Sequence, residues 1–529
     1  MKELLTSLVA VIAISGAQAQ SMATSPKLVI ELTIDQLRTD YIERFSPLFG
    51  PNGFKRLWRD GQVYTEIEFP FARPDMSSAA AAISTGTVPR INGIVATSWL
   101  NRKTLNPVNC VNDPAFMGVY TDETVSASQL LTSTVTDELK IATQGKAIVY
   151  SFSPFSETAV LSAGHAADGA FWLNPSNGKW CGSTYYGDFP RWLSQYNDQE
   201  GIDFRIDKMV WEPTYPISMY KYLSSDWVDT SFSHKFSRFK YQKYSKLTTS
   251  PLINDEINKV VKTCLDRSTI GYDAVTDFLS ISYYGGNFDH KTVKEAPYEL
   301  QDTYVRLDKS IENLLNIVDR KVGLKNVLFV VVSNGYTDPD SFDSNAYRIP
   351  RGEFYMNRSA ALLNMYLMAL YGEGKYVDGY LGQQIYLDHT LIQKKQLLLS
   401  EVLDQSANFL VDVSGVQEVY SSHRLLLGSW NPQIRLERNL YHPLRSGDLT
   451  MKILPGWMIM QEKPLSSQLV RSAYFSAPLI FLGNAVAPTI IRTPIQVERL
   501  AATLSQVLRI RPPNACSAMS LPIQYLKKK

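Results

Sequence analysis

The sequence of 529 residues predicts an α/β fold with a mostly parallel central sheet and helices on both faces of that sheet. Two observations predict this class. Short apolar runs bounded by turn signals alternate with amphipathic helical patterns, as they do where helices connect parallel strands. Several of these runs are apolar at nearly every position, which is typical of strands buried on both faces.

The expected elements follow in chain order. Strands are expected at 27–35, 146–154, 277–284, 326–335 and 477–483, and amphipathic helices at 134–144, 298–323 and 496–508. Ligands of open sheets bind beyond the carboxyl ends of the strands. Chemistry is therefore expected at Asp35, at 285–290 and at Ser333 and Asn334.

Bulk properties narrow the class of protein. A net charge of +2 with 20% charged residues does not suggest a nucleic-acid binder. Residues 1–19 have a lysine, a short apolar run and a small-residue end, which predict a signal peptide and an exported, periplasmic or envelope-associated protein. No later stretch is long and apolar enough to predict a transmembrane segment. Residues 27–529 are expected to form one domain, with irregular insertions near 170–262 and 338–440 that act as a cap.

The four cysteines leave two alternatives open. They are far apart in the chain and lack the spacing of a zinc site. One or two disulfides would suit an oxidising compartment, and buried free thiols are the equal alternative. The residues concerned are Cys110, Cys181, Cys264 and Cys516.

A helix of small residues is expected within "FARPDMSSAAAAISTGTVPRINGI", residues 71–94. Asp75 is a plausible N-cap and Gly86 a stop signal. Met76, Ser77 and Ser78 fall in the first turn, where a hydroxyl would lie among unpaired N–H groups that can hold an anion. The simpler alternative is that these serines only cap the helix.

Seven motifs in order resemble the alkaline phosphatase superfamily, especially the phosphate-irrepressible alkaline phosphatases and the type I phosphodiesterase/nucleotide pyrophosphatases. They are "KLVIELTIDQLRTDYIERF", "GFKRLWRDG", "STGTVPRINGI", "TVTDELKIAT", "SAGHAADGAFW", "YELQDTYVRLDKSI" and "YHPLRSGDLTMKILPGW". The resemblance implies two zinc ions that clamp a phosphate ester and a Thr or Ser nucleophile that forms a phosphoenzyme. Paired metals stabilise the attacking and leaving oxygens.

The family positions carry few of the expected groups. Asp35 matches a metal-binding aspartate, and one carboxylate remains at Asp289, with His290 beside it. The nucleophile position falls on Met76, whose thioether cannot attack phosphorus usefully. The other metal positions fall on Gly285, Ser333, Asn334 and Ser476, and the positions that hold the phosphate fall on Thr97, Phe155 and Glu157.

These departures lead to the interpretation of a noncatalytic binding or scaffold protein of the cell envelope. No cofactor is then expected, beyond one residual metal at Asp35, Asp289 and His290, and the partner would be an envelope protein or a ligand in the cleft. One alternative is an active phosphomonoesterase or phosphodiesterase with a rearranged one-metal site that uses Ser77 or Ser78. Another is a structural subunit of an envelope or secretion assembly.

Simpler roles for the same residues stay open. Asp35 could cap the following helix or pair with Arg38. Asp289 and His290 could be a polar loop pair. His165 of "SAGHAADGAFW" is interpreted as a structural histidine.

Overall fold

The computed structural model describes residues 25–223, 231–337, 352–428, 431–462, 465–469 and 475–526. Its central sheet has ten strands in the order β22-β2-β21-β13-β1-β12-β7-β8-β9-β6. The five middle strands are parallel to one another, which confirms the predicted class. They are β13 (Val327–Ser333), β1 (Leu28–Asp35), β12 (Asp277–Tyr284), β7 (Val149–Ser153) and β8 (Gly169–Leu173).

Antiparallel pairs enter toward both sides of the sheet. β21 is antiparallel to β13 and to β2, β9 is antiparallel to β8, and β6 is antiparallel to β9. The outermost strand β22 runs parallel to β2. The bounds are β21 (Leu479–Gly483), β2 (Gln62–Tyr64), β22 (Thr489–Ile491), β9 (Trp180–Ser183) and β6 (Gly118–Val119).

Helices cover both faces because successive side chains of each buried strand point to opposite sides. In β1, Leu28, Ile30 and Leu32 lie in one core cluster, and Val29 lies in another. The first cluster includes residues of α1 (Thr39–Phe45), α2 (Phe54–Asp60), α9 (Leu252–Arg267) and α10 (Pro297–Lys321). The opposite face is covered by α3 (Met76–Thr85), α5 (Val135–Ala142), α6 (Ser156–Ala163) and α16 (Arg499–Leu508).

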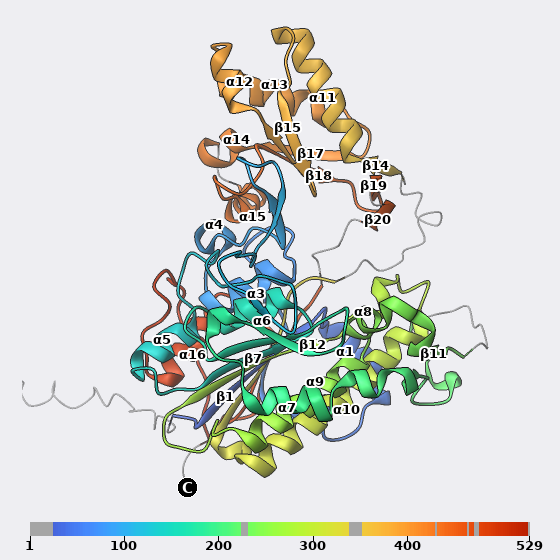
Figure 1. Cartoon of the computed structure of the whole chain (residues 1–529), viewed down its shortest axis with the longest axis vertical. Helices are drawn as coiled ribbons and strands as arrows, with labels where there is room; N and C mark the ends of the chain where they lie inside the picture. The colour runs from blue at the N-terminus through green and yellow to red at the C-terminus, as the bar shows by residue number, and fades with distance from the viewer. Residues whose placement is uncertain are drawn as a thin grey trace, which may run out of the picture.

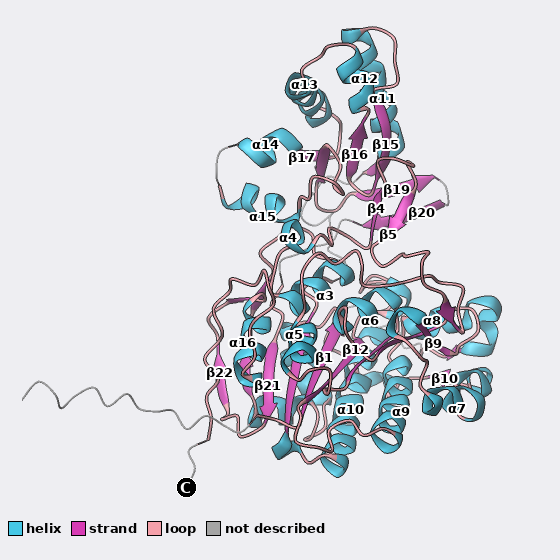
Figure 2. Ribbon diagram, turned by 60° about the vertical axis from the view of Figure 1, so that its left-hand side comes forward, coloured by secondary structure: helices cyan, strands magenta, loops and turns pink. Residues whose placement is uncertain are grey.

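A smaller unit stands beyond the carboxyl ends of the parallel strands, with α3 and α4 (Pro89–Asn92) between it and the sheet (Figures 1 and 2). It has its own apolar core, which joins a four-stranded sheet to three helices, one of them the short helix α12 (His389–Lys394). We call residues 352–469 of the described chain the cap. The bounds are β15 (Val377–Leu381), β16 (Gln384–Leu387), β17 (Val416–Ser421), β18 (Leu449–Ile453), α11 (Met356–Tyr371) and α13 (Leu399–Val411).

The stretch near 170–262 takes a different place from the cap. It contains β9, α7 (Arg191–Gln199), α8 (Lys243–Thr248) and α9. Its aromatic residues Trp192, Trp211 and Phe236 belong to the same core cluster as α9 and α10. The stretch therefore widens one face of the sheet instead of covering the carboxyl edge.

The structure bears on the expectations about the cysteines and about membrane-spanning helices. All four cysteines are free thiols, and three of them are buried. Within the described ranges, no helix is long and apolar enough to cross a membrane. Residues 1–19, where the signal peptide is expected, lie outside the described part.

Candidate active site

The carboxyl edge of the parallel strands holds the first group of predicted site residues. β1 ends at Asp35, β12 ends one residue before Gly285, and β13 ends at Ser333. The three strands run side by side and parallel. Parallel pairing therefore brings these residues, and Asn334 after them, to one edge.

Neutral groups contact the backbone and the buried carboxylate of Asp35. Asn334 donates a side-chain N–H to Asp35 Oδ1, and its side-chain oxygen accepts the N–H of Gln36 at 3.0 Å. Gly285 donates its N–H to Asp35 O at 3.0 Å. A Cβ at Gly285 would lie 2.9 Å from that oxygen, so the close approach requires a glycine. An amide thus holds the carboxylate where the family pattern expects a metal.

Two serines at family metal positions contact the segment that follows Asp35. Ser333 Oγ donates to Leu37 O at 2.8 Å, and Ser476 O accepts the N–H of Thr39 at 2.8 Å. We call the five residues that this segment gathers the strand-end group. They are Asp35, Gly285, Ser333, Asn334 and Ser476.

Asp35 does not cap the helix after it. The N-cap of α1 is Arg38, and the helix has no side-chain cap. Arg38 forms an ion pair with Asp40 at 2.7 Å, and its guanidinium lies 4.1 Å from the ring centre of Tyr41. Asn334 binds the Asp35 carboxylate across the sheet.

Asp289 and His290 lie in the exposed loop after β12. The Asp289 carboxylate forms an ion pair with Lys246 of α8, and its N–H donates to Thr249 O at 3.3 Å. Both Asp289 and His290 adopt left-handed backbone angles, with φ of 54° and 55°. The Lys246 contact favours the polar-loop alternative for Asp289, because its carboxylate already has a cationic partner.

The first turn of α3 is capped as its sequence predicts. Asp75 Oδ1 accepts the N–H of Ser78 at 2.8 Å, and Ser78 Oγ in turn receives the N–H of Asp75 at 3.0 Å. Gly86 ends the helix in the left-handed conformation. Ser78 is therefore a capping residue. Within the described chain, the N–H groups of Met76 and Ser77 make no hydrogen bond and keep their capacity to hold an anion.

Ser77 begins a chain of hydroxyl groups that ends on a carboxylate. Its Oγ lies 2.9 Å from Thr97 Oγ1, and Thr97 Oγ1 donates to Asp75 Oδ2 at 3.0 Å. Because the Thr97 proton is directed to Asp75, Ser77 is the donor in the first bond. The N–H of Thr97 also donates to Asp75 Oδ2 at 2.7 Å. Ser77 is fully buried, so its hydroxyl does not face solvent.

The other family positions for phosphate surround this chain. Cys110 donates its N–H to Thr97 O at 2.9 Å, and the adjacent Asn109 donates to Glu157 Oε1 at 2.6 Å. Burial first, and the Glu157 charge second, raise the pKa of the Cys110 thiol well above its usual range. Phe155 is the N-cap of α6 and Glu157 lies in the first turn of that helix. We call Met76, Ser77, Thr97, Phe155 and Glu157 the helix group.

Two aromatic side chains lie between the chain after β13 and helix α3. The ring of Phe69 lies against Gly335, the residue after Asn334, and packs at 5.7 Å from the ring centre of Phe71. Phe71 belongs to one apolar cluster with Ala82 of α3. Phe69 and Phe71 therefore link the segment just after β13 to α3.

A salt bridge that sequence reasoning missed fixes the cap to this region. Arg73, two residues before the Asp75 cap, donates twice to the carboxylate of Glu437, both times at 2.6 Å. Glu437 belongs to α15 (Pro432–Leu440) of the cap, and its side chain is only 2% exposed. Neither residue stands in a recognisable motif, because the two are joined only by the tertiary fold.

His165 has structural partners. Its Nδ1 lies 2.8 Å from Asp137 Oδ2 and its Nε2 lies 3.0 Å from Leu130 O. The hydrogen bond to Asp137 raises the pKa of His165 and outweighs burial. Burial would raise the pKa of Asp137, but the bonds from His165 and from nearby N–H groups lower it. The pair fixes the loop after α6 to the first turn of α5.

A model of the type I phosphodiesterase/nucleotide pyrophosphatase family matches residues 29–473. The chain belongs to this family. The match confirms the resemblance to the alkaline phosphatase superfamily that the ordered motifs indicate. It covers the strand-end group except Ser476, the helix group and the whole cap.

Similarity to known relatives extends over almost the whole of this chain. The chain is 28% identical to alkaline phosphatase PafA of Elizabethkingia meningoseptica, over 96% of each chain. It is 28% identical to alkaline phosphatase PhoV of Synechococcus elongatus, over 92% of this chain and 91% of the relative. A crystal structure of PafA matches with a TM-score of 0.83 at 26% identity, over 94% of this chain and 98% of that one.

These relatives correct two expectations. The interpretation as a noncatalytic protein is wrong, because end-to-end relatives are alkaline phosphatases and the family is hydrolytic. The expectation of no cofactor is wrong for the same reason, because the chain belongs to a family, and is similar to alkaline phosphatases, for which the resemblance implies zinc. Yet no group of three or more His, Cys, Asp or Glu side chains that could hold a metal occurs in the described part. The described family positions do not fit a two-zinc cage, because Gly285, Ser333, Asn334 and Ser476 offer no carboxylate or imidazole ligand.

Proposed function

We propose that this protein is a phosphoric ester hydrolase with a rearranged site, and that it prefers phosphodiesters. One observation carries the proposal: the similarity to alkaline phosphatases extends over 96% of both chains and includes the elements that form the site. Similarity over the whole scaffold supports hydrolysis of phosphoric esters. The altered side chains at the family's metal and nucleophile positions imply a different catalytic mechanism.

The helix group would bind the phosphoryl group. The N–H groups of Met76 and Ser77 stand at the positive end of α3, a ten-residue helix, where an anion is stabilised. The carboxylates of Asp75 and Glu157 lie close by. They repel the dianion of a monoester more than the monoanion of a diester. This charge pattern supports the preference for diesters.

Ser77 is the proposed nucleophile. Its Oγ would form the new bond to phosphorus as the bond to the ester oxygen breaks. The hydroxyl proton would pass to Thr97 Oγ1 while the Thr97 proton moves to Asp75 Oδ2, along the bonds present in the structure. The departing oxygen takes a proton from water, and the hydroxide so formed attacks phosphorus and breaks its bond to Ser77 Oγ, which releases the phosphate monoester. The proton on Asp75 returns through Thr97 to Ser77 Oγ. Because Ser77 is fully buried, the first turn of α3 must shift and Met76 must move aside for attack.

The test compares turnover of bis(4-nitrophenyl) phosphate and 4-nitrophenyl phosphate, each with and without added zinc. We expect the diester to have the larger kcat/KM. Ser77→Ala should lower kcat by at least about 100-fold, the effect of losing a nucleophile's assistance. Ser84→Ala is the matched control, because Ser84 lies in the same helix and, among the described residues, its Oγ bonds only to Ala81 O. Turnover at the uncatalysed rate in every condition would remove the proposal.

Export is proposed from the first 19 residues, whose pattern is that of a signal peptide. Fractionation of cells that express the full chain should recover a shortened protein in the exported fraction. Recovery of the uncut chain in the cytosol would refute export. Association with an envelope partner stays a prediction, and a pull-down from native envelope tests it.

A further inference from the structure

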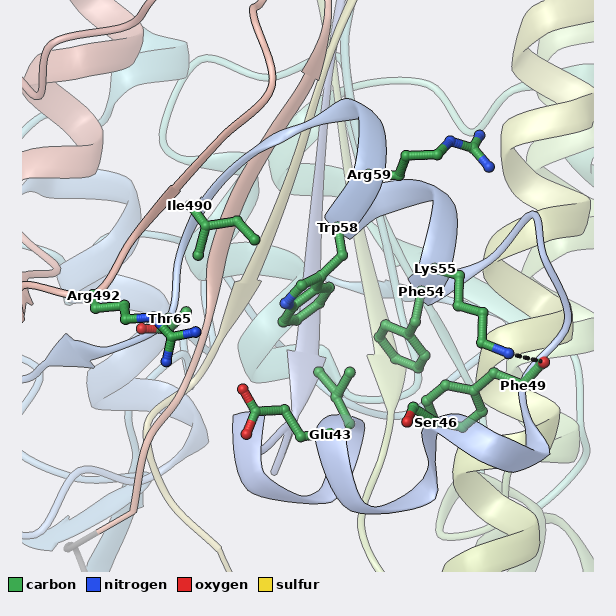
Figure 3. A pocket seen from close by; sticks show the side chains of 11 residues that line it. Glu43, Ser46, Phe49, Phe54, Lys55, Trp58, Arg59, Thr65, Ile490 and Arg492 are labelled. Atoms are coloured by element: carbon green, nitrogen blue, oxygen red, sulfur yellow. Dashed lines mark hydrogen bonds between the residues drawn. The ribbon is translucent and has the colours of Figure 1, made fainter.

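A cavity of about 460 Å³ lies outside the candidate active site, between α1, α2 and the chain around β22 (Figure 3). Its volume is in the range of small-molecule sites. The lining combines a floor of large apolar side chains with a charged rim. The lining includes Glu43, Phe49, Phe54, Lys55, Trp58 and Arg492.

The aromatic floor is formed before any ligand binds. The ring centres of Phe49 and Phe54 are 5.2 Å apart, and the ring of Trp58 packs edge-on to Phe54 at 6.4 Å. Phe49 and Phe54 are buried, while Trp58 is partly exposed and its indole faces the cavity (Figure 3). A flat apolar group placed on Trp58 would remove this exposed surface from water.

A buried carboxylate fixes the loop that presents the floor. Asp308 of α10 is 1% exposed and accepts the N–H of Phe54 at 2.7 Å and that of Gly50 at 2.9 Å. A Cβ at Gly53 would lie 2.2 Å from Asp308, so only glycine fits there. The rings are therefore preorganised, which reduces the entropy lost on binding.

Of the four charged side chains on the rim, Lys55 and Arg59 have partners in the described fold, and Glu43 and Arg492 do not. Lys55 Nζ donates to Phe49 O at 2.9 Å, and Arg59 pairs with Asp60 at 2.7 Å and points away from the cavity (Figure 3). Glu43 and Arg492 instead extend over the same side of the cavity. Within the residues that the structure describes, neither forms an ion pair or a side-chain hydrogen bond, with the other or with a third residue.

We propose that this cavity binds a free aromatic α-amino acid. The ring would lie on Trp58 and Phe54, the carboxylate would bind the Arg492 guanidinium, and the ammonium would bind the Glu43 carboxylate. Arginine matches a carboxylate with two parallel hydrogen bonds, which gives the anion contact a direction. A ligand that carries both charges uses both rim residues, whereas an aromatic acid or amine uses one. This site is independent of the proposed hydrolase activity.

Calorimetric titration of the full chain with four compounds tests the proposal. The compounds are L-phenylalanine, phenylacetate, phenethylamine and L-alanine. We expect saturable binding of phenylalanine below about 10 mM, the weak end of small-ligand affinity. Phenylacetate and phenethylamine should bind about tenfold more weakly, because each loses one charge-assisted contact. Alanine should not bind measurably, because it lacks the ring.

Variants assign each contact. Arg492→Gln should abolish the preference for phenylalanine over phenethylamine, and Glu43→Gln should abolish the preference over phenylacetate. Arg56→Gln is the matched control and should keep both preferences, because Arg56 lies on the same helix α2, pairs with Asp60 at 3.7 Å and is not a lining residue of the cavity. No saturable binding of phenylalanine would overturn the proposal. Equal affinity for phenylacetate and phenylalanine, or an Arg492→Gln protein that keeps its preference for phenylalanine over phenethylamine, would overturn it as well.

Discussion

The ion pair between Arg73 and Glu437 should hold the cap against the loop that precedes α3. Arg73→Ala removes both bonds of 2.6 Å and leaves the Glu437 carboxylate, which is 2% exposed, without its guanidinium. Breaking a buried pair from one side costs about 3–5 kcal/mol. Arg73 is 29% exposed, so water can reach part of the vacated space. We therefore expect a loss of about 2–4 kcal/mol in the free energy of unfolding.

Urea unfolding followed by circular dichroism measures this loss. Arg59→Ala is the matched control, because its pair with Asp60 is exposed on both sides and should contribute at most about 1 kcal/mol. Glu437→Gln in the Arg73→Ala protein should recover part of the loss, because it removes the stranded charge. A loss no larger than that of the control, or a double variant less stable than Arg73→Ala, would refute the reasoning.

Three further predictions concern the interior. Asp137 raises the pKa of His165, so the stability that this pair contributes is present below the ordinary histidine pKa of 6.5 and is lost as pH rises through the folded value. The difference in unfolding free energy between the native protein and His165→Gln should therefore narrow from pH 6 to pH 9. A difference that widens would contradict this prediction. The native protein should have the same mass with and without reductant, because its cysteines are free thiols. The three buried thiols, Cys110, Cys181 and Cys264, should resist alkylation at pH 8, because burial raises the pKa of each. Rapid labelling of any of them would show that its surroundings are open. Asp302→Ala should cost about 3–5 kcal/mol in urea unfolding, because this buried carboxylate accepts bonds from Trp211, Thr214, Tyr220 and Arg306; a loss under about 1 kcal/mol would mean that the network is dispensable.

Local chemistry let the sequence determine the class of fold and much of the site's placement. The apolar runs that end at Asp35, Tyr284 and Ser333 became β1, β12 and β13, because such runs are stable only when covered on both faces. The small-residue helix begins after Asp75 and ends at Gly86, since capping depends on residues within one turn. Parallel pairing of those strands then required their carboxyl ends to meet.

Only the tertiary structure decided which groups touch. The side-chain amide of Asn334 donates to Asp35, and Lys246 forms an ion pair with Asp289. The hydroxyl of Thr97 connects Ser77 to Asp75. These contacts join residues that are far apart in the chain, and a residue's type does not specify a distant partner. The ion pair of Arg73 with Glu437 and the cavity beside Trp58 also depend on contacts between residues far apart in the chain. Both arise where separate elements meet, and their positions are set by how the cap and the helices pack on the sheet.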